Sequence, residues 1–176
     1  FSINKLMKLI KNLVFLGMMG SGKTTLGKIV SKRLNKKFID IDQIIEIEEG
    51  MTISDIFQKK GEPFFRKIEE KVSLQNLKKS NFVISLGGGA FLNKKIQKEV
   101  LNNHISIWLK WDNKNLIKKI KNSKKRPIAM QLDEVDLDRL INDRSKIYSK
   151  AKYQIKCDRL SKLELIKKII EFNDKG

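Results

Sequence analysis

The sequence predicts an α/β fold in three layers, α/β/α, with a five-stranded parallel sheet in the middle. Short apolar runs of strand length recur along the chain, and helical periods separate them, which is the pattern of a parallel sheet covered on both faces. A glycine-rich segment also joins the first run to the first helix. The expected strands are residues 13–17, 37–42, 82–87, 106–111 and 153–158.

Segments with helical periodicity lie between these strands and after the last one. The expected helices are residues 23–34, a helical region from 43 to 79 broken near Gly50 and Gly61, then 93–101, 113–121, 135–150 and 161–172. The stretch 122–134, NSKKRPIAMQLDE, is long for a tight connection, and loops of this length are usually functional or mobile. With no repeat or linker, we expect one domain over residues 1–176, with a core at 13–172 and a mobile lid at about 121–133.

The composition predicts a globular, soluble protein of the cytoplasm. Hydrophobic residues make up 40% of the chain and charged residues 33%, which is typical of a folded domain. No apolar run approaches the roughly 20 residues that a membrane helix needs, so we expect no membrane partner. The first residues lack a signal-peptide core, and the one cysteine, Cys157, fits a reducing compartment.

The net charge of +18 raises the question of a nucleic-acid partner. Only six of the 38 cations are arginines, and the lysines are spread along the chain, in pairs on nearly every expected helix. A nucleic-acid footprint would gather this charge on one stripe and often interleave aromatic residues. The pattern therefore favours a lysine-rich solvated surface over a dedicated nucleic-acid face, and we expect no nucleic-acid partner.

The strongest motif is GMMGSGKT, residues 17–24, which matches G-x-x-x-x-G-K-[ST]. It follows a predicted strand and opens a predicted helix, so backbone N–H groups and the helix dipole can hold phosphate oxygens. Lys23 would reach the outer phosphates, and Thr24 would offer its hydroxyl to Mg²⁺. The alternative is a plain glycine turn. We expect ATP and Mg²⁺ as cofactors, bound by Gly20, Ser21, Gly22, Lys23, Thr24 and Thr25.

The rest of the chain narrows the class of P-loop protein. It lacks the guanine-reading Asn-Lys-x-Asp of GTPases, and it is smaller than motor and ring ATPases. A small domain with a long basic loop favours a small-molecule kinase, because phosphoryl transfer requires the exclusion of water by a closing segment. Arg126 lies in that loop, where it could stabilise the charge on the transferring phosphoryl group and contact the nucleotide. The alternative for Arg126 is a solvated loop charge.

FIDIDQ, residues 38–43, supplies two carboxylates at the end of the second strand. Strand alternation would send Asp40 and Asp42 to the same face, at the edge where open α/β sheets bind ligands. One acid would then serve Mg²⁺ and the other a substrate hydroxyl. The alternative is that Asp42 caps the following helix.

Arginines and glycines mark the remaining candidate positions. Arg66 and Arg144 stand on predicted helices in a chain that otherwise uses lysine, which suggests a need for a planar, bidentate group. Each could instead pair with a nearby acid. The third strand ends in SLGGGAF, residues 85–91, with glycines where many P-loop proteins have an acid. From the residues alone, a strained strand-to-helix turn would also explain them.

Six motifs in one order resemble the shikimate kinase family: GMMGSGKT, FIDIDQIIE, ISDIFQKKGEPFFRKIEE, SLGGGA, KRPIA and DRSKIY. The match runs from Leu13 to about the final helix, and the spacing of all six makes it specific. It implies ATP-dependent phosphorylation of the 3-hydroxyl of shikimate, a small ring with a carboxylate and three hydroxyls. The reaction lies on the chorismate pathway to aromatic amino acids. The family also implies a monomer.

The resemblance assigns a role to each candidate. It makes Lys23, Asp42 and Arg126 catalytic, with Asp42 binding the reacting hydroxyls and acting as the base. It makes Thr24 and Asp40 the magnesium-side pair. It implies that shikimate is bound by Asp42, Arg66, Gly87, Gly88, Gly89 and Arg144. In that set Arg66 and Arg144 grip the carboxylate, and Gly88 offers its N–H to a ring hydroxyl. Side chains at the glycines would fill the space of the ring.

Two other functions remain open. A kinase for gluconate or a nucleotide would share the P-loop but would not need the arginine pair with three glycines. A non-catalytic relative would be expected to lose Lys23, Asp42 or Arg126, and all three are present. Among the other residues, Lys119 is a candidate for stacking on adenine, and His104 is expected at the surface.

Overall fold

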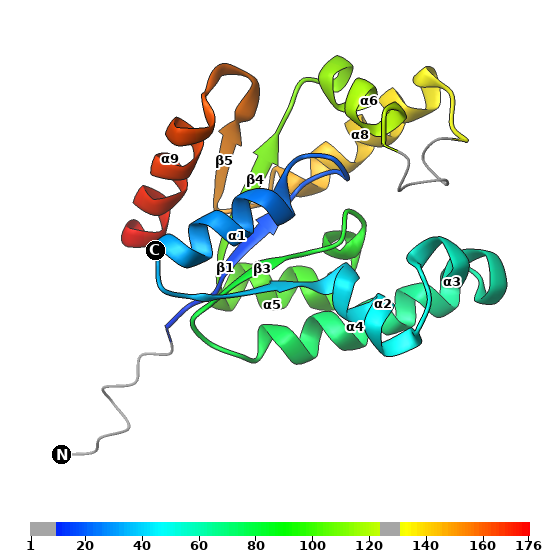
Figure 1. Cartoon of the computed structure of the whole chain (residues 1–176), viewed down its shortest axis with the longest axis horizontal. Helices are drawn as coiled ribbons and strands as arrows, with labels where there is room; N and C mark the ends of the chain where they lie inside the picture. Colours follow the sequence, from blue (N-terminus) through cyan, green and yellow to red (C-terminus); the bar gives the residue numbers. More distant parts are fainter. Residues whose placement is uncertain (1–9, 124–130) are drawn as a thin grey trace.

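The computed structural model describes residues 10–123 and 131–176, and within them the chain forms an α/β/α sandwich (Figure 1). The sheet has five parallel strands in the order β2-β3-β1-β4-β5. The strands are β1 (Leu13–Leu16), β2 (Lys37–Asp40), β3 (Phe82–Ser85), β4 (Ile105–Lys110) and β5 (Tyr153–Lys156). The predicted fold class is therefore confirmed.

Helices connect the strands and cover the sheet on both faces. They are α1 (Lys23–Arg33), α2 (Ile41–Glu49), α3 (Ile53–Lys60), α4 (Glu62–Leu77), α5 (Lys94–Asn103), α6 (Asn113–Lys121), α8 (Glu134–Tyr148) and α9 (Lys162–Lys175). Two short 3-10 turns, η2 (Ala90–Leu92) and η3 (Cys157–Arg159), follow β3 and β5. The region predicted to be helical from 43 to 79 is divided into three helices, with breaks at Gly50 and Gly61 as expected.

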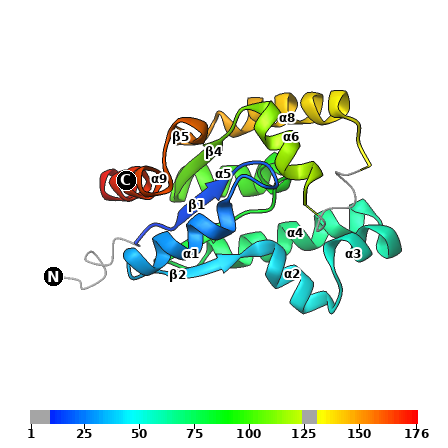
Figure 2. The ribbon, with the colours of Figure 1, turned by 45° about the horizontal axis from the view of Figure 1, so that its top comes forward.

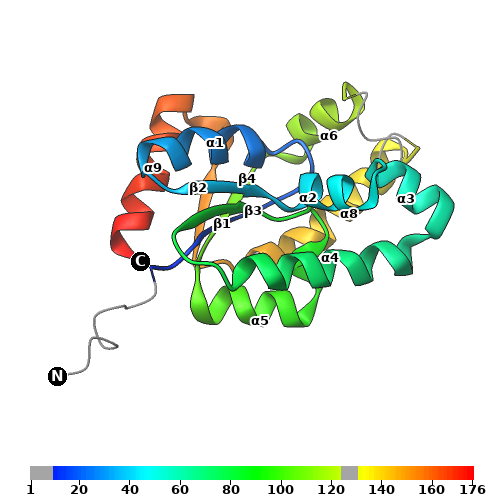
Figure 3. The same ribbon diagram turned by 60° about the horizontal axis from the view of Figure 1, so that its bottom comes forward.

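Two hydrophobic layers hold the helices on the sheet. In Figure 3, α1 and α9 lie on one face of the sheet, and α4 and α5 lie on the other. Alternate residues of β1 feed the two layers, because successive side chains of a strand point to opposite faces. Val14 and Leu16 join the larger core, while Leu13 and Phe15 pack in the other. The two layers occupy the two faces of the sheet, so the polar site residues are left to the loops at the strand ends.

The carboxyl ends of the strands all open on one edge, where the P-loop, α2 and the end of β3 meet (Figure 2). β2 lies beside β3, and Asp40 is the register partner of Ser85. The acid on β2 therefore lies beside the glycine segment that follows β3. Among the residues that the structure describes, no helix is long and apolar enough to cross a membrane.

Two expectations about local structure are wrong. β2 ends at Asp40 and α2 begins at Ile41, so Asp42 lies in the first helical turn and not on the strand. The Asp40 side chain accepts a hydrogen bond from the Gln43 N–H at 3.3 Å, so the helix cap predicted as an alternative for Asp42 is made by Asp40. His104 is also buried, at 7% exposed, because it ends α5 against β4.

Candidate active site

The P-loop has its glycines where the backbone requires them. Gly20 and Gly22 have φ angles of 79° and 91°, in the left-handed region that side chains disfavour. Lys23 Nζ donates to the carbonyl oxygens of Gly17 at 2.6 Å and Met18 at 2.9 Å. No acidic residue lies in the first turn of α1, and no side chain caps that end. The helix N-terminus therefore retains the positive potential that binds a phosphate group.

Thr24 and Asp40 lie together beside the P-loop. Thr24 Oγ1 donates to Asp40 Oδ2 at 2.5 Å, which joins the start of α1 to the end of β2. A hydroxyl and a carboxylate are hard oxygen donors, which is the chemistry that Mg²⁺ prefers. No cluster of three or more His, Cys, Asp or Glu suited to a metal occurs among the described residues. A small oxygen set fits Mg²⁺, because this ion usually keeps several waters and binds substrate phosphates.

Gly87, Gly88 and Gly89 form a backbone surface, called the glycine floor, against which the charged side chains of the site lie. A Cβ at Gly87 would lie 2.7 Å from Asp42 Oδ1 and 2.8 Å from Glu69 Oε1. A Cβ at Gly89 would lie 2.5 Å from Arg66 Nη1, and one at Gly88 would lie 3.4 Å from Arg144 Nη1. The glycines thus allow both carboxylates and both guanidinium groups to approach the backbone.

Arg66 is held by two acids of its own helix. Its Nη1 donates to Glu69 Oε2 at 2.7 Å, and its Nε and Nη2 both donate to Glu62 Oε1 at 3.2 Å. The pairing that the sequence left open is therefore present, and it fixes the direction of the guanidinium group without removing it from the glycine floor. The aromatic rings of Phe57 and Phe65 lie beside it, with Cζ 6.0 and 5.3 Å from their centroids.

Arg144 reaches the same floor from α8. Its Nη1 lies 3.8 Å from Met18 Sδ, a weak contact with the P-loop. Its Nε is buried and has no hydrogen-bond partner within the described part of the chain. A buried, unpaired N–H is costly, so this donor is suited to an anionic ligand at the site.

Glu69 is not among the predicted site residues; it is one of the nearby acids with which Arg66 pairs. It is only 3% exposed, and its burial raises the pKa of the carboxyl, an effect that Arg66 and Arg144 oppose. Its three-residue spacing from Arg66 on a predicted helix is a sequence signal for the ion pair between them. No sequence signal indicates the contact between Glu69 and Gly87, because it joins α4 to the end of β3.

Tyr148 was also missed. It is 1% exposed, and its hydroxyl donates to the carbonyl oxygen of Gly88. Burial raises the pKa of this phenol to about 12, so the group stays a neutral donor at ordinary pH. This hydrogen bond holds the backbone of Gly88 in place. No local pattern pointed to it, because 60 residues separate the two groups.

Arg126, the predicted lid arginine, lies outside the described residues. Of the helices that flank its segment, α6 ends at Lys121 as expected, and α8 begins at Glu134, one residue earlier than expected. Lys121 Nζ donates to Glu134 Oε1 at 3.0 Å, so the two ends of the connection are in contact. On α6, the ammonium of Lys119 lies 3.2 Å from the ring centroid of Trp111, and burial lowers its pKa.

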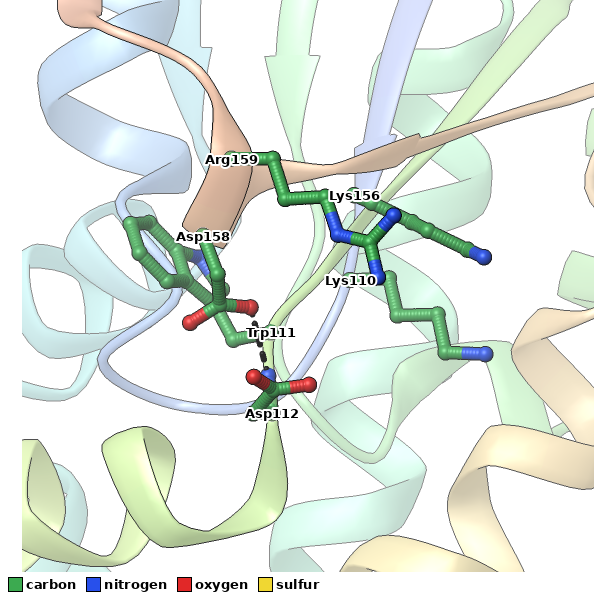
Figure 4. Close-up of a pocket in the computed structure, with 6 residues that line it drawn as sticks. All are labelled: Lys110, Trp111, Asp112, Lys156, Asp158 and Arg159. Carbon is green, nitrogen blue, oxygen red and sulfur yellow. Dashed lines mark hydrogen bonds between the residues drawn. The ribbon is translucent and has the colours of Figure 1, made fainter.

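A separate pocket lies at the ends of β4 and β5, close to the P-loop (Figure 4). It is lined by Lys110, Trp111, Asp112, Lys156, Asp158 and Arg159. The Asp112 N–H donates to Asp158 Oδ2 at 2.7 Å and so joins the two strand ends. None of the predicted substrate residues lines this pocket, so it does not mark the glycine floor.

Comparison with known proteins identifies the family of this chain. The family model for shikimate kinase matches residues 19–174. The shikimate kinase of Sulfurihydrogenibium sp. is 35% identical over 161 residues, 92% of this chain and 96% of the relative. That of Bacillus subtilis is 39% identical over 168 residues, 92% and 88% of the two chains. The structure of shikimate kinase from Acinetobacter baumannii in complex with shikimate has a TM-score of 0.87 at 29% identity and covers 97% of each chain. The chain belongs to the shikimate kinase family.

Proposed function

We infer that this chain catalyses the ATP-dependent phosphorylation of the 3-hydroxyl of shikimate, giving shikimate 3-phosphate and ADP on the route to chorismate. One observation carries the inference. Two carboxylates and two guanidinium groups from α2, α4 and α8 surround the Gly87–Gly89 floor, which lies against the P-loop through Gly88 and the Met19 backbone. A small polyhydroxy acid needs this combination, with cations for its carboxylate and an acceptor for its hydroxyls.

Asp42 is the group that we assign to the reacting hydroxyl. Its Oδ1 faces the Cα of Gly87, and it lies in the first turn of α2, the helix that follows β2. A carboxylate there can accept the hydroxyl proton as the phosphoryl group is transferred. Arg66 and Arg144 then fix the ring through its carboxylate, and Gly88 offers its backbone N–H to a ring hydroxyl. Holding the reacting groups in one orientation is the larger part of catalysis in phosphoryl transfer.

Nucleotide binding is assigned to the P-loop residues 20–25 and to Arg126. Lys23 already holds two P-loop carbonyls, so its ammonium lies at the phosphate cradle and is assigned to the outer phosphates. Thr24 and Asp40 are assigned to Mg²⁺, whose charge would balance the phosphate oxygens. Arg126 is assigned to the lid, where it would exclude water and contact the transferring group. The lid and the single domain over residues 1–176 are parts of this proposal.

The setting of the enzyme is proposed on the same basis. We assign it to the cytoplasm as a monomer, with shikimate as its small-molecule partner and no nucleic-acid or membrane partner. The absence of a nucleic-acid partner is supported by the lysines, which are spread along the chain, and some of which pair with acids, as Lys60 with Glu49 at 2.8 Å and Lys95 with Glu70 at 2.8 Å. Charge arranged in this way serves solubility.

The test is ADP release by the purified protein with ATP and Mg²⁺. We compare shikimate with no acceptor, gluconate and quinate. Turnover that requires shikimate, and that falls at least about 10²-fold with Asp42→Asn, is expected from the loss of the base. Tight ATP binding without shikimate-dependent turnover would refute the proposal.

The arginine clamp has its own matched control. Arg66→Lys keeps the charge but loses the bidentate fork, so KM for shikimate is expected to rise about tenfold. Arg139→Lys makes the same change at an exposed position of α8, where the partner is Asp136 at 3.6 Å. It should leave KM unchanged. Equal effects of the two substitutions would show that Arg66 does not contact the substrate.

A further inference from the structure

The direction of each peptide group decides whether a P-loop can bind phosphate. A trans peptide is planar, and its C=O and N–H point in opposite directions. A hydrogen bond that holds a carbonyl oxygen away from the phosphate site therefore directs the N–H of the following residue toward that site. Lys23 Nζ holds the carbonyl oxygens of Gly17 and Met18. The peptide between Ser21 and Gly22 needs a different donor.

Trp111 supplies that donor from the end of β4. Its indole Nε1 donates to the carbonyl oxygen of Ser21 at 2.9 Å, across 90 residues of sequence. Ser21 is fully buried, so water cannot easily replace the bond. The N–H on the opposite side of this peptide belongs to Gly22, the glycine immediately before α1. The indole thus orients an N–H at the helix end that forms the phosphate site.

The tryptophan is itself held from several sides. The Lys119 ammonium lies 3.2 Å above its ring, a cation–π contact that ties it to α6. The next residue, Asp112, donates its N–H to Asp158 Oδ2 at 2.7 Å, which fixes the backbone beside the ring (Figure 4). The ring also packs against both hydrophobic layers. A side chain held in this way can keep one orientation of the Ser21 carbonyl.

We propose that Trp111 is a positioning residue for the nucleotide: its indole N–H holds the Ser21 carbonyl outward and so presents the Gly22 N–H to a phosphate group. This rests on the inferred kinase reaction only in naming ATP as the ligand. A tryptophan that served the core alone would need no donor at this carbonyl. The proposal therefore concerns the indole N–H of Trp111 and the binding of the nucleotide, and it predicts no effect on the binding of shikimate.

The decisive variant is Trp111→Phe, which keeps an aromatic face for Lys119 but removes the donor. We expect the dissociation constant of ADP, measured by calorimetry without shikimate, to rise about fivefold, since a net hydrogen bond contributes a factor of this order. KM for ATP should rise in parallel. KM for shikimate at saturating ATP should change less than twofold. Unchanged ADP affinity, or equal increases in both KM values with a lowered Tm, would overturn the proposal.

The matched control is Trp108→Phe on β4, three residues before Trp111, where the indole centroid instead lies 5.9 Å from the Tyr148 ring centroid. It should bind ADP with wild-type affinity. In this variant Trp111 is the single tryptophan, so its fluorescence should change saturably as ADP is added. No change would overturn the proposal even if Trp111→Phe fails to fold. Because ADP binding is measured without shikimate, failure of the shikimate reaction would not be mistaken for failure of this inference.

Discussion

Replacing Gly89 by alanine should abolish most of the activity while leaving the fold nearly as stable as before. Gly89 has φ −98° and ψ −9°, which alanine adopts without strain. The added Cβ would lie 2.5 Å from Arg66 Nη1, 2.8 Å from Nη2 and 2.9 Å from Cζ. All three atoms belong to the end of a flexible side chain, so the guanidinium group can move away at a small cost.

The size of the effect follows from that movement. Ordinary contact begins at 3.4 Å, so the guanidinium group must shift by about 1 Å. A misplacement of this size at an active site costs on the order of 10²-fold in rate. The free energy of unfolding should fall by less than about 1 kcal/mol, because a shift of about 1 Å lets the flexible Arg66 side chain keep its pairs with the exposed Glu62 and the buried Glu69.

The assay is kcat and KM for shikimate by ADP release, together with urea unfolding of the same variant. Gly50→Ala is the control, because Gly50 has φ 64° and a Cβ there would meet nothing within 4 Å. That variant should lose about 1 kcal/mol of stability through the left-handed backbone and keep its activity. Wild-type kcat/KM for Gly89→Ala, or a loss of stability larger than that of Gly50→Ala, would refute the reasoning.

Four further predictions follow from buried groups and a helix cap. Tyr148→Phe should raise KM for shikimate severalfold and leave KM for ATP unchanged, because the Gly88 carbonyl loses its donor; equal changes in both would contradict this. Burial raises the pKa of Tyr148 to about 12 from an ordinary 10, so its contribution to stability is complete below about pH 10 and is lost as pH rises toward 12. By urea unfolding, the free energy of unfolding should therefore fall less between pH 9 and pH 11 for Tyr148→Phe than for wild type. The Cys157 thiol, 1% exposed with its pKa raised by burial to about 12, should resist alkylation at pH 8 in the native protein and react in urea; rapid native labelling would contradict its burial. Ser161→Ala removes the capping box at α9 and should cost about 1 kcal/mol by urea unfolding, with unchanged activity; no loss would mean that the cap does not stabilise the helix.

The P-loop shows how much a local pattern can predict. Its strand, glycines, lysine and threonine are consecutive, so their contacts follow from one turn of chain, and the structure has Lys23 and Thr24 beside the phosphate-binding helix end. Asp42 shows where such reasoning fails. Alternation along a strand was the wrong argument, because the helix begins two residues earlier than expected. The side chain still faces Gly87, since β2 pairs with β3 and carries α2 to the same edge.

The sequence by itself determined the periodic elements, the parallel sheet, the phosphate loop and the family, because each depends on residues close together or on motifs in a fixed order. Only the tertiary structure decided that Glu69 faces Gly87, that Tyr148 supports Gly88, and that Trp111 holds the Ser21 carbonyl. The last two pairs are 60 and 90 residues apart. Such contacts depend on strand order and on which face a helix presents, and a single sequence records neither.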